Sequence, residues 1–127
     1  MAAGGKGVST RVLVVDDDPS IRLLCRVNLE LDGHEVVEAA SLQEARRHLE
    51  DERFDVVVLD VHLGGETSGE LVVESHAQEP PIPVVLVTGS AETLEGESTA
   101  DAVLPKPFEP QALVDTVRNL AGVPAHR

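Results

Sequence analysis

The chain has 127 residues, the length of one domain, so a second folded unit of ordinary size is not expected. It carries 23 acidic residues against 10 Lys and Arg, a formal net charge of −13 at pH 7. Because nucleic acids and anionic membrane surfaces are bound through clustered Lys and Arg, this charge argues against both as partners.

The sequence also argues against secretion and membrane insertion. Residues 1–11 are small and polar and lack the apolar stretch of a signal peptide. No apolar run approaches the ~20 residues that span a bilayer. The lone cysteine, Cys25, cannot form an internal disulfide, and we expect it to be a buried structural thiol. We therefore expect a cytoplasmic chain.

The first elements are a strand, a helix and a second strand. Residues 12–15 are all apolar, which is typical of a strand buried on both faces of a parallel sheet. Asp18 followed by Pro19 predicts a helix start, with a capping side chain and a proline in the first turn. Gly33 predicts the end of that helix. A second short strand is expected over residues 35–39.

The middle of the chain repeats this alternation. Ser41 and Glu44 form a capping-box pattern, in which a Ser and a Glu three residues later cap a helix. The third strand is expected over residues 54–59. A glycine-containing loop follows it, and Thr67 or Ser68 is expected to begin the next helix.

The last part of the chain contains two more apolar runs, over residues 84–87 and 102–104, which predict the fourth and fifth strands. Residues 89–100 between them are small and polar, so the fourth helix is expected to be short or irregular. Pro110 is expected to begin the last helix.

Five alternating strands and helices predict an α/β fold with a doubly wound, five-stranded parallel sheet. Crossovers between parallel strands are right-handed, so helices are expected to cover both faces of the sheet.

Acidic, hydroxyl and lysine side chains stand directly after the apolar runs or within two residues of their ends. They are Asp16, Asp17, Asp60, Thr88 and Lys106. Each one singly is equally well explained as a turn or capping residue, and Asp18 is better explained as a helix cap. Because ligands bind at the carboxyl ends of the strands in open α/β sheets, the five together predict a site at this edge.

Three carboxylates brought close together repel one another unless a hard divalent cation lies among them, and Mg²⁺ prefers oxygen ligands with several waters retained. A carboxylate can also act as a nucleophile toward phosphorus. A lysine and a metal ion would neutralise charge on a transferring phosphoryl group. The residue types therefore predict a phosphoryl-transfer site.

Four segments in order resemble the receiver domain of bacterial two-component response regulators, and together they span about residues 11–121. The segments are residues 14–19, 58–63, 87–89 and 104–108. The resemblance implies the flavodoxin-like strand order 2-1-3-4-5. We also expect a flexible N-terminal tail over residues 1–10 and a C-terminal tail over residues 122–127.

The resemblance implies a role for each site residue. Asp60 is similar to the phosphoacceptor, and Asp17 to a direct ligand of Mg²⁺ or Mn²⁺, with Asp16 acting through water. The backbone carbonyl of His62 is implied as a further metal ligand. Thr88 and Lys106 resemble the pair that bonds the phosphoryl oxygens.

The family further implies a cis peptide bond between Lys106 and Pro107. The expected partners are a sensor histidine kinase or histidine phosphotransfer protein as donor, and an unknown downstream protein. The expected protein is a stand-alone receiver that takes part in phosphorelay signal transduction. It would catalyse no reaction beyond phosphorylation and dephosphorylation of its own aspartate.

Two departures from the family pattern affect the region expected to signal to a partner, and not the site around Asp60. Val103 stands where the family commonly has an aromatic side chain, and the chain has no Tyr or Trp. Residues 89–100 are also fewer than usual. The route by which the phosphorylated state is read is therefore expected to be unusual.

Two alternatives stay open. A degenerate receiver would act as a constitutive protein-interaction module, and the unusual segment after Thr88 favours it. A haloacid-dehalogenase-like phosphatase would use Asp16 and Asp18 with Thr88 and Lys106, but it would leave Asp60 without a role.

Overall fold

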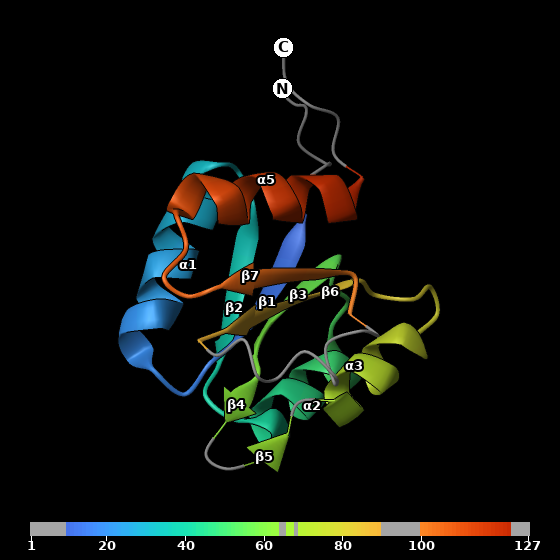
Figure 1. The fold of residues 1–127 in the computed structure, drawn as a ribbon. Helices are drawn as coiled ribbons and strands as arrows, with labels where there is room; N and C mark the ends of the chain where they lie inside the picture. Colours follow the sequence, from blue (N-terminus) through green and yellow to red (C-terminus); the bar gives the residue numbers. More distant parts are fainter. Residues whose placement is uncertain (1–9, 64–65, 68, 90–99, 123–127) are drawn as a thin grey trace.

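The computed structural model describes residues 10–63, 66–67, 69–89 and 100–122. Its elements alternate along the chain, and a short hairpin is inserted after the third strand (Figure 1). In order they are β1 (Arg11–Val15), α1 (Pro19–Leu31), β2 (Glu35–Ala39), α2 (Leu42–Asp51), β3 (Val56–Asp60), β4 (His62–Leu63), β5 (Glu66–Thr67), α3 (Gly69–His76), β6 (Val84–Thr88), β7 (Ala102–Pro105) and α5 (Pro110–Ala121).

The main sheet has five parallel strands in the order β2-β1-β3-β6-β7. Because β4 and β5 belong to the hairpin, this order is the predicted 2-1-3-4-5. The predicted α/β doubly wound fold is therefore confirmed. The predicted irregular fourth helix falls on residues 90–99, and both predicted tails fall largely on residues 1–9 and 123–127, outside the described residues.

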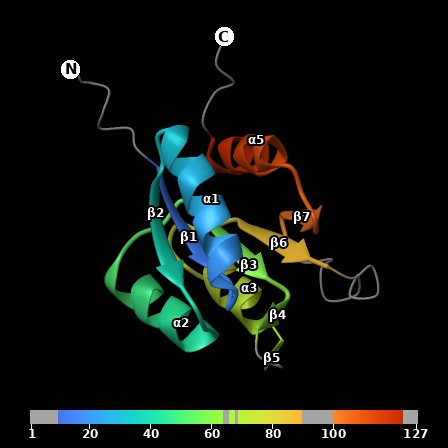
Figure 2. The same ribbon diagram turned by 90° about the vertical axis from the view of Figure 1, so that its left-hand side faces the viewer.

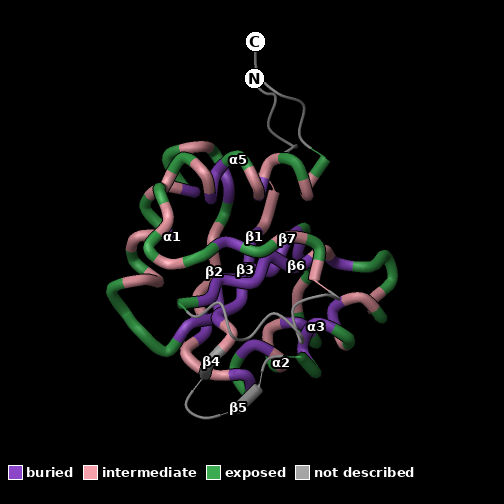
Figure 3. The backbone as a smooth tube through the Cα atoms, viewed as in Figure 1, coloured by how far each residue is buried: buried purple, intermediate pink, exposed green. Residues whose placement is uncertain are grey.

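Helices cover both faces of the sheet, with α1 and α5 on one face and α2 and α3 on the other (Figure 1). Successive side chains of a strand point to opposite faces, and β1 shows this clearly. Leu13 and Val15 pack into the cluster under α2 and α3, whereas Val12 and Val14 pack under α1 and α5. All four are buried, which explains why the strand is apolar throughout (Figure 3).

The helix starts follow the capping chemistry that the sequence predicts. The Asp18 side chain accepts a hydrogen bond from the Ser20 amide at 2.9 Å, and Pro19 is the first residue of α1. At α2, Ser41 Oγ accepts from the Glu44 amide at 3.1 Å. The Glu44 carboxylate accepts in return from the Ala40 amide at 2.7 Å. Both caps satisfy amides that the first helical turn leaves without a partner.

One predicted boundary was wrong, and one of two alternatives for another is excluded. The helix expected to begin at Thr67 or Ser68 starts at Gly69, and Thr67 instead pairs with His62 in the β4–β5 hairpin. Ser68 lies outside the described residues. The third strand begins at Val56 rather than residue 54, and it includes Asp60. Phe54 is buried just before the strand, so its apolar character reflects burial outside the strand.

The C-terminal end of α1 is tied to α5 by an ion pair. Gly33 has φ +96°, a left-handed conformation that glycine adopts readily, and it ends the helix as predicted. The preceding Asp32 accepts two hydrogen bonds from Arg118, at 2.9 and 2.6 Å. These bonds lower the pKa of Asp32, burial opposes the shift, and a hydrogen bond from His34 adds to it.

The Asp32–Arg118 pair should make stability depend on pH at the acidic end. A carboxyl with a lowered folded-state pKa adds stability above its unfolded pKa and loses it as the pH falls through the folded pKa. We therefore expect Arg118→Gln to lower the urea midpoint at neutral pH, and the effect to shrink as the pH falls below the ordinary range of an aspartate carboxyl. Urea melts of both proteins across this range measure the difference. Arg47→Gln, at an exposed arginine of α2, is the matched control. An Arg118→Gln effect that is equal at both ends of the range would contradict the assignment.

Candidate functional site

The predicted site residues converge at the carboxyl edge of the sheet. Asp16 follows β1, Asp60 ends β3, and Thr88 ends β6. Lys106 follows β7, and its amide donates to the Thr88 carbonyl at 2.7 Å. Viewed from the side of α1, the β4–β5 hairpin lies just beyond the same end of β3 (Figure 2). The register of parallel strands therefore gathers side chains that lie up to 90 positions apart in the sequence.

The acidic part of the site consists of Asp16, Asp17 and Asp60. One carboxylate oxygen from each lies within 4.8 Å of the other two. Asp16 and Asp60 are buried, at 2% and 7% exposed, whereas Asp17 is exposed. Mg²⁺ prefers oxygen ligands and retains several bound waters, and a carboxylate cluster with one exposed member matches this preference. The donor set therefore fits a hard divalent cation.

Lys106 supplies the positive charge of the site. Its Nζ lies 3.5 Å from Asp16 Oδ2 and 3.5 Å from Asp60 Oδ1. Burial lowers the pKa of Lys106, but the two carboxylates outweigh burial and the net pKa is raised. The lysine is therefore protonated at neutral pH and stands beside Asp60. The Lys106–Pro107 peptide bond is cis, as the family resemblance implies.

The positions of the two remaining predicted residues, Thr88 and His62, follow from the strands to which they belong. Thr88 is 5% exposed and lies one position beyond Val87, the residue that pairs with Asp60 in the sheet. His62 begins β4, two residues after Asp60. Thr88 thus lies on β6, the neighbour of the strand β3 that carries Asp60. His62 follows the end of β3 by two residues.

Arg22 is a contact of this site that the sequence analysis missed. Its Nη1 donates to the main-chain carbonyl of Asp16 at 2.7 Å. The available signal was an arginine one helical turn after the Asp18 cap, beside the apolar residues that face the sheet. The sequence could not reveal its target, because the carbonyl belongs to a different element.

The expected thiol is confirmed as structural. Cys25 is fully buried in the cluster under α1 and α5. Burial raises its pKa to about 12, and the nearby charge of Asp16 adds to the shift. A thiol in this state is a poor nucleophile, because thiolate is the reactive form.

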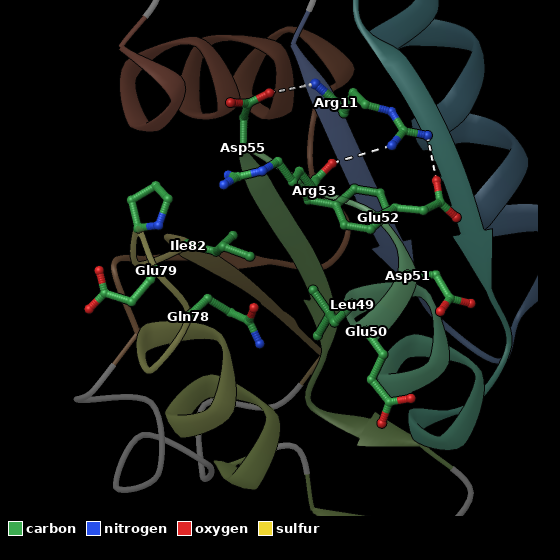
Figure 4. A pocket seen from close by; sticks show the side chains of 12 residues that line it. Arg11, Leu49, Glu50, Asp51, Glu52, Arg53, Asp55, Gln78, Glu79 and Ile82 are labelled. Carbon is green, nitrogen blue, oxygen red and sulfur yellow. Dashed lines mark hydrogen bonds and ion pairs between the residues drawn. The ribbon is translucent and has the colours of Figure 1, made fainter.

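A pocket of about 540 Å³ lies at the opposite edge of the sheet, around the amino ends of the strands (Figure 4). Its wall includes Arg11, which begins β1, and Ile82, which precedes β6. The Arg11 guanidinium bonds Glu52 at 2.6 Å and lies 5.2 Å from the Phe54 ring centre. None of the predicted site residues lines this pocket, so the candidate phosphoryl-transfer site is at the carboxyl edge of the sheet and not here.

Among the described residues, no helix is both long enough and apolar enough to cross a membrane.

Comparison with known proteins agrees with this geometry. The protein family described as "Response regulator receiver domain" matches residues 12–118. The chain is 33% identical over 108 residues to the alkaline phosphatase synthesis transcriptional regulatory protein PhoP of Bacillus subtilis (strain 168). That match covers 82% of this chain and 45% of PhoP, so the chain spans about half the length of this curated relative.

Solved structures show the same fold. A CheY-like receiver domain protein from Methanospirillum hungatei JF-1 has a TM-score of 0.82 and 31% identity, covering 90% of this chain and 94% of that chain. Response regulator TrrA from Thermotoga maritima, solved in complex with Mg(2+)-BeF, has a TM-score of 0.79 and 28% identity. The match covers 87% of this chain and 98% of TrrA. The family match, the strand order of the sheet and the cluster of Asp16, Asp17 and Asp60 agree. The chain therefore belongs to the family of response regulator receiver domains.

Proposed function

We propose that Asp60 accepts a phosphoryl group from a phosphohistidine, in a reaction that requires Mg²⁺ or Mn²⁺. The observation that carries the proposal is the position of Asp60, whose carboxylate clusters with those of Asp16 and Asp17 and lies 3.5 Å from the protonated Lys106. The donor is a sensor histidine kinase or a histidine phosphotransfer protein. The phosphorylated chain then acts in the cytoplasm, through phosphorelay or by binding a downstream protein.

In the proposed transfer, an Asp60 carboxylate oxygen forms a bond to phosphorus. The bond between phosphorus and the donor imidazole nitrogen breaks, and the electron pair stays on that nitrogen. Lys106, already beside Asp60, neutralises charge on the transferring group. The Thr88 hydroxyl donates a hydrogen bond to a phosphoryl oxygen.

The metal would be held by Asp17 directly, by Asp16 through water, by Asp60, and by the backbone carbonyl of His62. When bound, the ion supplies positive charge to the phosphoryl oxygens. The clustering of the three carboxylates supports this assignment. A solved relative in complex with Mg(2+)-BeF supports it by analogy.

A receiver domain is phosphorylated on an aspartate and is not a conventional enzyme. The phosphatase alternative assigns no role to Asp60, yet the Asp60 carboxylate clusters with those of Asp16 and Asp17. The matched family and the sheet order also argue against that alternative.

A valine stands at the position where the family resemblance implies an aromatic readout. Val103 lies on β7 and is 38% exposed, so a partly exposed valine stands at the aromatic position. Residues 90–99, which also belong to the expected output region, lie outside the described residues. We therefore propose that a partner protein reads the phosphorylated state by binding a surface that does not depend on an aromatic side chain at position 103.

Intact mass spectrometry tests the proposed function without any partner protein. Incubation with acetyl phosphate and Mg²⁺ should add the mass of one phosphoryl group, because the small donor replaces the phosphohistidine. The same incubation with excess EDTA should add none. Failure to gain mass with donor and metal in excess would instead favour a constitutive interaction module.

A further inference from the structure

Arg22 joins the loop that carries the metal acids to the neighbouring strand β2. Its Nη1 donates to the Asp16 carbonyl at 2.7 Å, and its Nε donates to Glu38 Oε1 at 2.9 Å. The side chains of Arg22 and Glu38 are 18% and 26% exposed. This pair is shielded from water more than an ordinary surface ion pair, so its geometry is better defined.

The carbonyl that Arg22 holds belongs to the peptide group between Asp16 and Asp17. A peptide group is planar, so fixing the direction of its carbonyl also fixes the direction in which the next residue leaves. The Asp16 amide is held separately, donating to the Ala39 carbonyl at 3.1 Å. Asp16 Oδ1 also accepts from the Asp18 amide at 2.9 Å. Arg22 thus adds a contact that fixes the peptide leading into Asp17, whose side chain is exposed.

Glu38 keeps Arg22 in place. Burial raises the pKa of Glu38, but hydrogen bonds from Arg26 and Arg22 outweigh burial and the net pKa is lowered. Glu38 is therefore ionised at neutral pH. Its second oxygen accepts from Arg26 at 3.0 Å, so two arginines of α1 share one carboxylate. Arg22 reaches the Asp16 carbonyl, whereas the bonds of Arg26 go to Glu38 and Glu30.

We propose that Arg22 is a positioning residue for the metal site. It holds the peptide between Asp16 and Asp17 so that both carboxylates face the same cation. The inference rests on the proposed function, because it assumes that these two acids bind Mg²⁺. It adds a residue on α1, outside the loop, that controls how tightly the ion is held.

Magnesium affinity without phosphorylation is the direct test. The chain has no Trp, so we would follow the Asp16, Asp17 and Asp60 amides in ¹H–¹⁵N spectra during titration with MgCl₂. Losing a contact that orients a metal ligand commonly weakens binding 10- to 100-fold, and we expect Arg22→Gln to raise the Kd about tenfold. Arg26→Gln, which loses a bond to the same Glu38 but none to the loop, should change the Kd less than about twofold.

A conservative variant separates positioning from stability. Arg22→Lys keeps the charge but has no planar fork to reach the carbonyl and Glu38 together, so its Kd should lie between those of wild type and Arg22→Gln. Thermal melts should show that Arg22→Gln and Arg26→Gln are folded at the titration temperature.

Two results would overturn the inference alone. One is a folded Arg22→Gln protein that binds Mg²⁺ as tightly as wild type, and the other is equal weakening by Arg22→Gln and Arg26→Gln. In both cases the wild type still binds the ion, so the proposed function stands. A wild type whose Asp16, Asp17 and Asp60 amides do not respond to Mg²⁺ would overturn both proposals together.

Discussion

Asp60→Asn should abolish the gain of phosphoryl mass when the protein is incubated with acetyl phosphate and Mg²⁺. An amide oxygen is a far weaker nucleophile toward phosphorus than a carboxylate. Asp16 lies as close to Lys106 as Asp60 does, but the proposed function assigns Asp16 and Asp17 to the metal and not to the phosphoryl group. The substitution keeps the shape of the side chain. It also removes one negative charge from a cluster of three, so the metal-free protein should be at least as stable as wild type.

The matched control is Asp55→Asn, which makes the same change just before the other end of β3. Asp55 is exposed and accepts a hydrogen bond from the Arg11 amide at 2.8 Å, far from the acidic cluster. Its phosphoryl uptake should equal that of wild type. Full uptake by Asp60→Asn, with the fold verified by circular dichroism, would place the acceptor elsewhere.

Leu29→Ala should destabilise the fold by roughly 2–5 kcal/mol, the range measured for large-to-small changes in packed cores. Leu29 is fully buried on the face of α1 that packs against the sheet and α5. Removing its side chain loses apolar burial and leaves a cavity that the surrounding strands fill poorly. Urea unfolding, with the slope and midpoint fitted together, measures the change.

Leu31→Ala, two residues further along the same helix, is the comparison. Leu31 is 81% exposed, so its truncation removes little buried surface and should change stability by no more than about 0.5 kcal/mol. Similar losses for the two variants would mean that α1 is packed on a different face than the structure describes.

The fold was predictable because its main elements are specified locally. The all-apolar run before Asp16 requires burial on both faces, and the caps at Asp18 and Ser41 fix where two helices begin. The β4–β5 hairpin was missed because two-residue strands have too little pattern to show a period of two. The start of the third strand was misplaced because Phe54 is buried without belonging to the strand.

The site was partly predictable for a related reason. Parallel strands end at one edge, so a polar residue directly after each apolar run belongs to that edge, as for Asp60 and Thr88. Distances between them needed the register, which brings Lys106 to 3.5 Å from both Asp16 and Asp60. Arg22 could not be found this way, because it reaches the site from the side of a helix and bonds a main-chain oxygen.

The most direct test of the central claim is to locate the phosphoryl group in the protein. Borohydride reduces an aspartyl phosphate to homoserine, which leaves a stable mark at the acceptor. After incubation with acetyl phosphate and Mg²⁺, tandem mass spectrometry of the reduced protein should find homoserine at position 60 and not at Asp16 or Asp17. Homoserine at either of those residues, or no homoserine in a protein that binds Mg²⁺, would contradict the assignment of Asp60 as the acceptor.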